Sequence, residues 1–472
     1  MLLQQKHGLF PRILGKGDNT HRLMELLLRM RSEVAAEEPS NASRLGMMPS
    51  SSIESLIIID REVDFATILL TQLTYEGLID ELFGIKDNQA EIDTSIVGPA
   101  PGQQGKAPTV PAQQGLSRKI QLDSSDKLYD QLRGTNFAII GDLLNKVARR
   151  LKHDYESRHG AKSTSELRDF VNKLPGYQAE QQSLNIHTGL AEEITKHTRS
   201  DLFGRVLEVQ QNLQQGTDPS SQHDTIEELI ARDTPLPIVL RLLCLESSIS
   251  GGIRQKDLEN FKRLILQAYG YQHLLTLSAL EKMRLLETRA SVNVLSLPGG
   301  AATGTKTNYN YLRKVLYLIV DEVNEQDPND VAYVYSGYAP LSVRLIQCVI
   351  QKPYLLSITK GANATSNGVS GAGHGWQGFE DALKNIKGET FNKIQRGEES
   401  ATKARQSLGG TGGRKTVVVM FLGGIAYTEI AALRFIARKE EGRRRILICT
   451  TGIISGGRMM DAAIERGTLG KS

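Results

Sequence analysis

Residues 416–450 read TVVVMFLGGIAYTEIAALRFIARKEEGRRRILICT. The run Thr416–Leu422 is apolar and rich in valine, which is typical of a strand buried in a parallel sheet. Gly423-Gly424 then predicts a turn, apolar residues at helical spacing predict a helix over Glu429–Arg438, and Ile446–Thr450 predicts a second strand. Strand, helix and strand form a βαβ unit, so the stretch predicts a parallel sheet with a right-handed crossover.

A further buried strand is predicted far upstream, at Leu56-Ile57-Ile58-Ile59, and it ends at Asp60. Helical periodicity dominates from Phe137 to about Ala290. The simplest organisation is a parallel α/β domain split by a mainly helical insertion, an α/β plus α fold. We predict four segments: 1–136, first part of the α/β domain; 137–270, helical domain with a long hairpin; 271–413, remainder of the insertion; and 414–472, second part of the α/β domain.

Composition and charge narrow the class of protein. The 472 residues are 23% charged and 40% hydrophobic, which is ordinary for a globular protein. A net charge of +4 without a basic tract argues against nucleic-acid binding. No apolar run reaches the roughly 18 residues that a membrane span requires, so we expect a cytoplasmic protein whose membrane contact is indirect. Cys244, Cys348 and Cys449 each lie in an apolar run, which predicts buried thiols in a reducing compartment.

Two apolar stripes at helical spacing predict a helical hairpin. The first ends at Pro175-Gly176, where we expect the turn, because proline disfavours a helix interior. The first stripe contains Leu167, Phe170, Val171 and Leu174, and the second contains Ile186, Leu190, Ile194, Leu202, Val206, Val209 and Leu213. The second stripe either packs in the core or forms a groove for a partner's amphipathic helix.

Two glycine-rich segments partly match phosphate-binding loops. Residues 299–307 nearly match the loop of nucleotide-binding proteins, but Lys306 comes one residue late and no good strand precedes it. Gly423-Gly424 lacks the third glycine of a dinucleotide fingerprint, so a turn that needs glycine geometry is favoured. The charged group at Asp60, Arg61, Glu62 and Asp64 is interpreted as a buried ion pair that pins a loop.

Catalytic and metal-binding patterns are also lacking. The nine histidines and three cysteines show no metal-ligand spacing, and Ser455 lacks the preceding glycine of a nucleophile elbow. We therefore predict no catalytic residue, no metal and no cofactor, and hence no enzyme.

Four segments in order resemble the SM (Sec/Munc) family, whose members grip SNARE helices during membrane fusion. The segments are residues 57–81, residues 333–344, Trp376 with its flanking glycines, and residues 423–434. The form Thr74-Tyr75-Glu76-Gly77 resembles the vacuolar protein-sorting branch in particular. The resemblance implies the split α/β fold with its helical insertion. It also implies that the hairpin is the SNARE template and that Pro175 matches the family's hinge proline.

The resemblance places a SNARE along residues 179–213. By periodicity we choose apolar anchors with two polar flanks: Ile186, Leu190 and Ile194, with Glu193 and Lys196. Vesicle-side R-type SNAREs are the expected partners, and syntaxin-type SNAREs are possible ones. Family members begin with a further α/β domain that forms half of the syntaxin cleft. Because residues 7–11 resemble the entry to the second domain, we expect that first domain to be missing here.

The vacuolar branch implies a tethering role as well. Its members serve in the HOPS and CORVET complexes beside a helical-solenoid subunit, at the membranes of the vacuole or lysosome and the late endosome. We expect the solenoid to dock near Glu429, Arg434 and Arg438. Two alternatives stay open: a scaffold subunit without SNARE binding, and a nucleotide-binding α/β enzyme.

Overall fold

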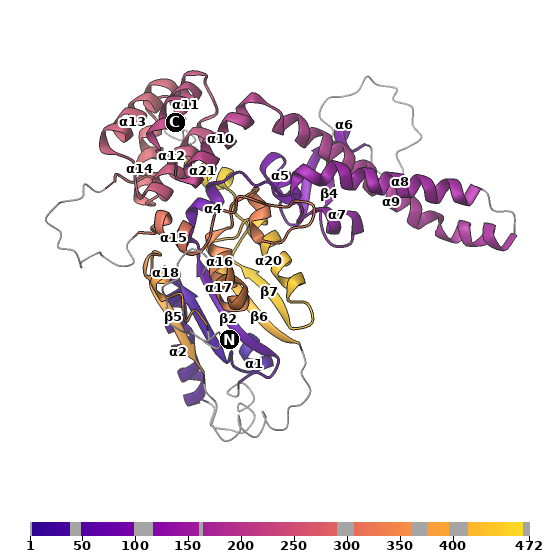
Figure 1. Ribbon diagram of the computed structural model, residues 1–472, viewed down its shortest axis with the longest axis horizontal. Coiled ribbons are helices and arrows are strands. Elements are labelled where there is room, and N and C mark those ends of the chain that lie inside the picture. Colours follow the sequence, from indigo (N-terminus) through magenta and orange to yellow (C-terminus); the bar gives the residue numbers. More distant parts are fainter. Residues whose placement is uncertain are drawn as a thin grey trace. The chain divides into compact units, whose positions relative to one another are not determined.

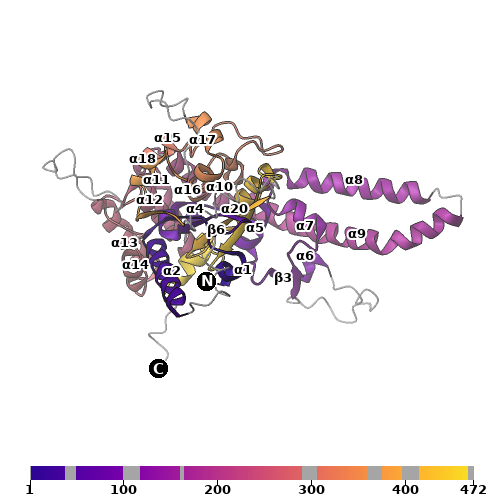
Figure 2. The same ribbon diagram turned by 90° about the horizontal axis from the view of Figure 1, so that it is seen from below.

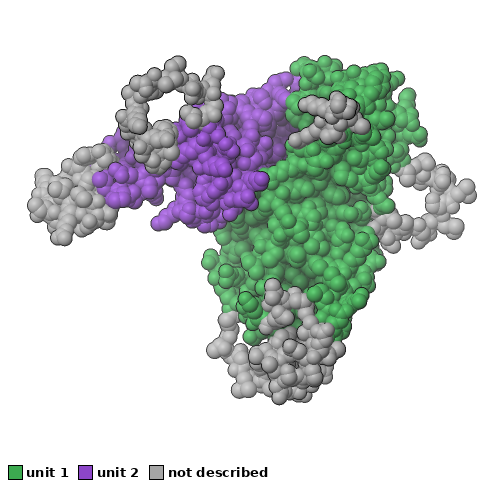
Figure 3. Space-filling model, turned by 180° about the vertical axis from the view of Figure 1, so that it is seen from behind, with its two compact units in different colours: residues 1–70, 209–321, 338–472 green, residues 71–208, 322–337 purple. Residues whose placement is uncertain are grey.

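The computed structural model (Figure 1) describes residues 2–37, 49–98, 117–159, 164–289, 306–359, 375–395 and 414–465. The chain folds into two compact units (Figure 3). Unit 1 contains residues 1–70, 209–321 and 338–472, and unit 2 contains residues 71–208 and 322–337. The boundaries between the two units differ from the predicted domain boundaries at 136, 270 and 413.

Unit 1 contains a five-stranded sheet in the order β5-β1-β2-β6-β7. The predicted strands are β2 (Ile53–Asp60), β6 (Lys415–Leu422) and β7 (Arg444–Thr450), and they are parallel neighbours, as expected. Ile57 pairs with Val419, so segments separated by the whole insertion complete one sheet. Two strands of this sheet were not predicted: β1 (Arg12–Lys16), parallel to β2, and β5 (Thr390–Ile394), antiparallel to β1.

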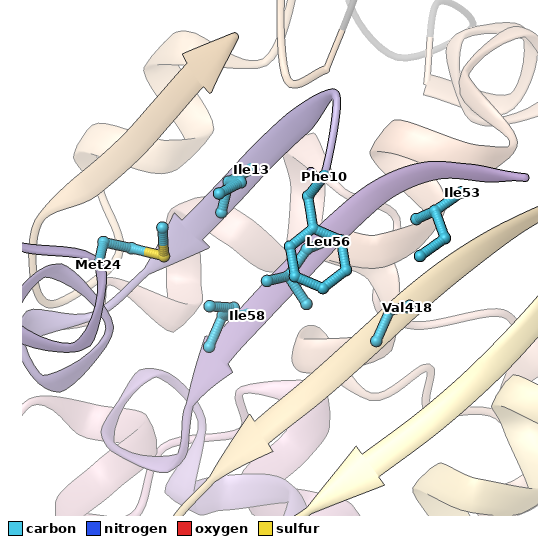
Figure 4. Close-up of a cluster of buried hydrophobic side chains, with 7 residues drawn as sticks. All are labelled: Phe10, Ile13, Met24, Ile53, Leu56, Ile58 and Val418. Atoms are coloured by element: carbon cyan, nitrogen blue, oxygen red, sulfur yellow. The ribbon is translucent and has the colours of Figure 1, made fainter. Parts of the chain in front are cut away.

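One face of this sheet packs against α2 (Asp18–Glu37). Alternate residues of β2, Leu56 and Ile58, point to this side, as the period of two in a strand requires. Figure 4 shows the buried cluster that they form, with Met24 contributed by α2. Its seven members are Phe10, Ile13, Met24, Ile53, Leu56, Ile58 and Val418. The crossover helix between β6 and β7 is α20 (Tyr427–Lys439), close to its predicted bounds.

The other helices of unit 1 surround the sheet or form a helical layer. They are α1 (Leu2–His7), α4 (Phe65–Leu69), α11 (Ser220–Ala231), α12 (Leu236–Ser250), α13 (Gln255–Tyr269), α14 (His273–Lys282), α15 (Tyr309–Val315), α16 (Leu341–Ile350), α17 (Lys352–Thr359), α18 (Glu380–Lys384) and α21 (Gly456–Ala463). Cys244 and Cys348 are buried as predicted, whereas Cys449 is only half-buried. Burial raises the pKa of the Cys244 thiol to about 12, so this thiol stays protonated.

Unit 2 is built around a hairpin of two long helices, α8 (Ile140–His159) and α9 (Thr164–Thr198), which lie side by side in Figures 1 and 2. Smaller elements pack at its base: α5 (Tyr75–Leu82), β3 (Gln89–Asp93), α6 (Thr94–Val97), β4 (Ser117–Gln121) and α7 (Lys127–Leu132). Helix α10 (Asp201–Gln215) follows α9 and runs on into unit 1.

The predicted turn of the hairpin was wrong. Pro175 lies inside α9, which continues through it, and the connection between the two helices falls at residues 160–163, outside the described part of the chain. The second apolar stripe is also shared by two helices, because α9 ends at Thr198 and α10 begins at Asp201. Among the described residues, none of the helices is long and apolar enough to span a membrane.

Candidate functional site

Two neighbouring polar contacts join the two helices of the hairpin. Arg150 of α8 forms an ion pair with Glu180 of α9, with 2.6 Å between Nη2 and Oε1. The hydroxyl of Tyr177 donates a hydrogen bond to the backbone oxygen of Leu151, at 3.1 Å. Ion pairs this exposed contribute little to stability, so these contacts mainly set the register of the two helices.

A buried hydrogen-bond chain fixes α9 to the base of unit 2. His187 lies between Tyr75 and Asp126, at 2.9 Å from the Tyr75 hydroxyl and 3.2 Å from a carboxylate oxygen of Asp126. Because a carboxylate only accepts, a neutral His187 carries its hydrogen on Nε2 and accepts from Tyr75 through Nδ1. Asp126 also accepts from Ser183 and from the first backbone amides of α7. Burial would raise the pKa of Asp126, but the hydrogen bonds from His187 and Ser183 hold it well below its ordinary value.

Gly189 allows the short helix α6 to approach α9 closely. A Cβ atom at this position would overlap the backbone oxygen of Ile96. Any larger residue would therefore push α6 away from the hairpin. Together with the His187 chain, this contact makes the carboxyl-terminal half of α9 a firmly held element.

Three of the predicted SNARE contacts were chosen for their apolar character, and two of them belong to the core. Leu190 and Ile194 are 0% exposed, where α9 packs on α5, α6 and α7. Their prediction as surface anchors was wrong, and core packing accounts for this stripe. Ile186 is half-buried and Pro175 is exposed. Glu193 and Lys196 pair with each other at the surface, at 2.8 Å.

The face of α9 that solvent reaches is polar. Its exposed residues recur at helical spacing along one side: Gln178, Gln181, Asn185, Glu192 and Lys196. Of the predicted SNARE contacts, Lys196 lies on this side, whereas Leu190 and Ile194 lie on the buried side of the helix. The complementary period of glutamine and asparagine was the signal that could have identified this face, which we name the amide face.

Carboxylates of the protein occupy both helix N-termini at which a nucleotide phosphate would bind. Asp60 accepts a hydrogen bond from the amide of Asn19 in the first turn of α2, at 2.9 Å. Glu429 accepts from the amide of Ala426, at the start of α20, at 2.9 Å. Because these amides are the anion-binding groups of an α/β turn, the geometry disfavours a nucleotide-binding enzyme.

Glu429 is also the partner of a buried arginine. Arg61 donates from Nη1 to Glu429, at 2.8 Å, and its guanidinium lies 3.9 Å from a carboxylate oxygen of Asp64. This confirms the predicted ion pair at the end of β2. It also contradicts the docking role predicted for Glu429, which is 0% exposed. Arg434 is half-buried and Arg438 is exposed.

Asp64 collects partners from distant segments of unit 1. It accepts hydrogen bonds from the Tyr309 hydroxyl at 2.5 Å and from the Ser342 amide at 3.0 Å. Trp376, the sole tryptophan, is buried and donates to the backbone oxygen of Leu345 at 2.7 Å. The residues that carry the family resemblance in unit 1 therefore hold the split domain together.

The glycine turn after β6 needs glycine, as predicted. Gly423 and Gly424 have φ angles of 88° and 105°, and a Cβ on either would crowd Arg61 or Ile454. Of the other predicted phosphate loop, residues 299–305 lie outside the described residues, and Lys306 forms an ion pair with Glu287 at 2.5 Å. No group of three or more potential metal ligands occurs among the described residues.

An exposed apolar cluster lies at the start of α14. Tyr271, Leu274 and Leu275 are 77%, 60% and 49% exposed, whereas Leu277 and Leu280 of the same helix are buried. We name these three residues the α14 patch. This patch was not predicted, although three large apolar residues within five positions exceed what one buried helix face can accommodate.

Comparisons with known proteins agree with this architecture. The model of the Sec1 family matches residues 1–462. Vacuolar protein sorting-associated protein 33A of Rattus norvegicus is 37% identical over 466 residues, which cover 99% of this chain and 70% of that protein. Vacuolar protein sorting-associated protein 33 of Schizosaccharomyces pombe is 35% identical, over 98% of this chain and 71% of that protein.

Solved structures share the fold at low sequence identity. The Unc18–syntaxin 1 complex from Monosiga brevicollis matches with a TM-score of 0.60 and 14% identity, over 98% of this chain and 69% of that one. The SM protein Vps45 in complex with the Qa SNARE Tlg2 matches with a TM-score of 0.57 and 15% identity, over 96% of this chain. This chain spans 65% of the length of that Vps45 chain.

Proposed function

The chain belongs to the Sec1 family, and from this premise we propose that it is an SM-type chaperone that binds SNARE proteins and promotes vesicle docking and fusion at the vacuole and late endosome. The observation that carries the proposal is the amide face of α9, two polar stretches of a firmly held helix on either side of Gly189, where α6 packs. The proposal needs no covalent step and no cofactor.

Relatives support the choice of partner. Two of the matching structures are complexes with SNAREs, namely syntaxin 1 and the Qa SNARE Tlg2. The relatives that match most of this chain are named for vacuolar protein sorting. The two complexes support SNAREs, the syntaxin type among them, as partners. We propose vesicle-side R-type SNAREs as the partners of the hairpin because the family resemblance implies that the hairpin is the SNARE template, with syntaxin-type SNAREs as further partners.

The proposed mechanism is templating. An isolated SNARE motif is disordered and loses conformational entropy when it becomes helical. A SNARE motif bound as a helix along the amide face would lose that entropy before it assembles with its partner SNAREs. Amide and charged side chains of the face would fix its register through hydrogen bonds. Because α9 is held by the His187 chain and by α6 at Gly189, the surface itself loses little entropy on binding.

The tethering role is proposed for a separate surface. The α14 patch presents three large apolar side chains, including a tyrosine, and such residues are enriched in protein interfaces. We propose that a helical-solenoid subunit of the HOPS and CORVET complexes docks there. The patch replaces only Glu429, whose side chain is buried; the half-buried Arg434 and the exposed Arg438 stay proposed contacts of the solenoid. The α14 patch also favours a second candidate function, a scaffold that binds the tethering subunit without binding SNAREs.

A titration tests the function. The purified chain is mixed with labelled vesicle-side and syntaxin-type SNARE motifs, and binding is followed by anisotropy. The chaperone proposal expects saturable binding of the vesicle-side motif. Binding of neither motif, together with retained binding of the solenoid subunit, would favour the scaffold.

The docking surface has its own test. Leu274→Ser in the α14 patch is expected to weaken capture of the solenoid subunit, because it removes apolar area from the centre of the contact. Met30→Ser changes another exposed apolar residue, on α2, and is expected to leave capture unchanged. Equal capture by both variants would contradict the proposed surface.

A further inference from the structure

A small pocket of about 60 Å³ lies in unit 1. Its walls come from the segment after β2, the end of α12, the end of α14 and two later loops. Charged side chains dominate the lining: Arg284, Lys306, Lys387, Glu62 and Glu287. Ser247 also lines it, and its hydroxyl accepts a hydrogen bond from the amide of Glu287 at 2.9 Å.

Arg284 reaches this pocket from an unfavourable backbone position. It follows the last residues of α14 with a φ of 58°, in the left-handed region. Helices commonly end with glycine in this conformation, because a Cβ atom is disfavoured there. Helix α12 does end this way, at Gly251 with a φ of 69°. Arg284, two residues after the end of α14, has this conformation without being glycine, and its side chain is exposed.

The charges of the pocket do not balance. Lys306 pairs with Glu287 at 2.5 Å, and Lys387 pairs with Glu62 at 2.6 Å. Among the described residues, the guanidinium of Arg284 has no hydrogen-bond or ion-pair partner. One positive charge is thus left over beside two ammonium groups, each of which has three hydrogens to donate.

We propose that this pocket binds a phosphate-type anion held by Arg284, Lys306 and Lys387. A guanidinium offers a planar pair of donors that matches two phosphate oxygens, and the lysines add charge from the sides. The volume admits a single tetrahedral anion but is far below the several hundred Å³ of a typical cofactor pocket. Inorganic phosphate and the phosphomonoester of a lipid headgroup share this chemistry.

Titration calorimetry with inorganic phosphate tests the proposal, at an ionic strength held constant with chloride. Arg284→Gly removes the guanidinium and places glycine where the backbone favours it, so the variant should fold at least as well. Asp233→Gly is the matched control, because Asp233 has a φ of 57° and does not line the pocket. We expect the full chain and the control to bind phosphate, and Arg284→Gly to bind at least ~10-fold more weakly.

Either of two results would overturn the proposal: no binding by the unchanged chain, or equal binding by the unchanged chain and Arg284→Gly. Thermal stabilisation alone is insufficient, because phosphate stabilises many proteins by exclusion from their surface. Vesicles of phosphatidylcholine, with and without a phosphoinositide, then separate the two sources. If the chain that binds phosphate also binds the phosphoinositide vesicles through Arg284, but not vesicles of phosphatidylcholine alone, the ligand is a lipid headgroup. Arg284-dependent phosphate binding without binding to either kind of vesicle would identify the free anion.

Discussion

Arg61 donates a hydrogen bond to Glu429 across 2.8 Å, although the two residues are 368 positions apart. Arg61 follows β2 directly, and Glu429 lies in the first turn of α20. Burial would lower the pKa of Arg61, but the carboxylates of Glu429 and Asp64 raise it above its ordinary value. This pair closes the split α/β domain around its helical insertion.

Removing one partner of this pair should destabilise unit 1 strongly. Glu429→Ala leaves the Arg61 charge buried with only Asp64 beside it and removes the cap of α20. We expect a loss of about 3–5 kcal/mol in the free energy of unfolding, measured by urea denaturation. Arg438→Ala, on the exposed side of the same helix, should change it by less than about 0.5 kcal/mol. Equal losses would show that the pair contributes nothing special.

The two glycines of α9 should respond in opposite ways to alanine. Gly189→Ala forces α6 away through the clash with the Ile96 oxygen, and we expect a loss of about 1–3 kcal/mol. At Gly176 no atom lies within 4 Å of an added Cβ, so Gly176→Ala should be neutral or stabilise by up to about 1 kcal/mol. Thermal denaturation of both variants provides the comparison, and a harmless Gly189→Ala would contradict the close packing of α6.

Stability should depend on pH through His223 of α11. A hydrogen bond from its ring to Glu246 raises the pKa of His223 above its ordinary value of 6.5. Because the folded pKa exceeds the unfolded one, the stabilisation is complete below pH 6.5 and is lost as the pH rises through the higher folded value. Urea denaturation from pH 6 to 9 should therefore show the advantage over His223→Gln shrinking as the pH increases. An advantage that is constant or grows with pH would contradict this assignment.

The buried stripe of α9 gives a further prediction. Leu190→Glu places a carboxylate where the side chain is 0% exposed, so it should unfold unit 2 rather than remove a binding contact. Circular dichroism and limited proteolysis of the variant measure this. A folded Leu190→Glu chain that has lost only SNARE binding would restore Leu190 as an anchor.

Sequence patterns predicted the parts of the fold that depend on strong apolar periodicity. Strands β2 and β6 lie inside the sheet and are largely buried, whereas β7 is an edge strand without a fully buried residue but has an apolar run at residues 446–449; each was identified. Strand β5 was missed because it lies at the sheet edge and most of its residues are exposed, which leaves no apolar pattern. The turn at Pro175 was wrong because one missing hydrogen bond does not end a helix of 35 residues.

The candidate site was harder to predict than the fold. A stripe such as Leu190 and Ile194 shows that one side of a helix is covered, but not whether the cover is the same chain or a partner. Here α5, α6 and α7 provide it. The proposed binding surface, the amide face, consists of polar residues, and these carry no hydrophobic signal in the sequence. The α14 patch became visible only once exposure could be assigned to Tyr271 and Leu274 individually.

The amide face is tested by the affinity of a vesicle-side SNARE motif for two variants, Asn185→Arg and Asn145→Arg. Asn185 lies on the amide face of α9, and Asn145 is an exposed asparagine on α8. We predict that Asn185→Arg weakens SNARE binding by at least ~10-fold, which is about 1.4 kcal/mol in binding free energy. Asn145→Arg should bind the SNARE motif like the unchanged chain. Unchanged binding by Asn185→Arg, in a chain that is demonstrably folded and binds the SNARE, would contradict the amide face as the template.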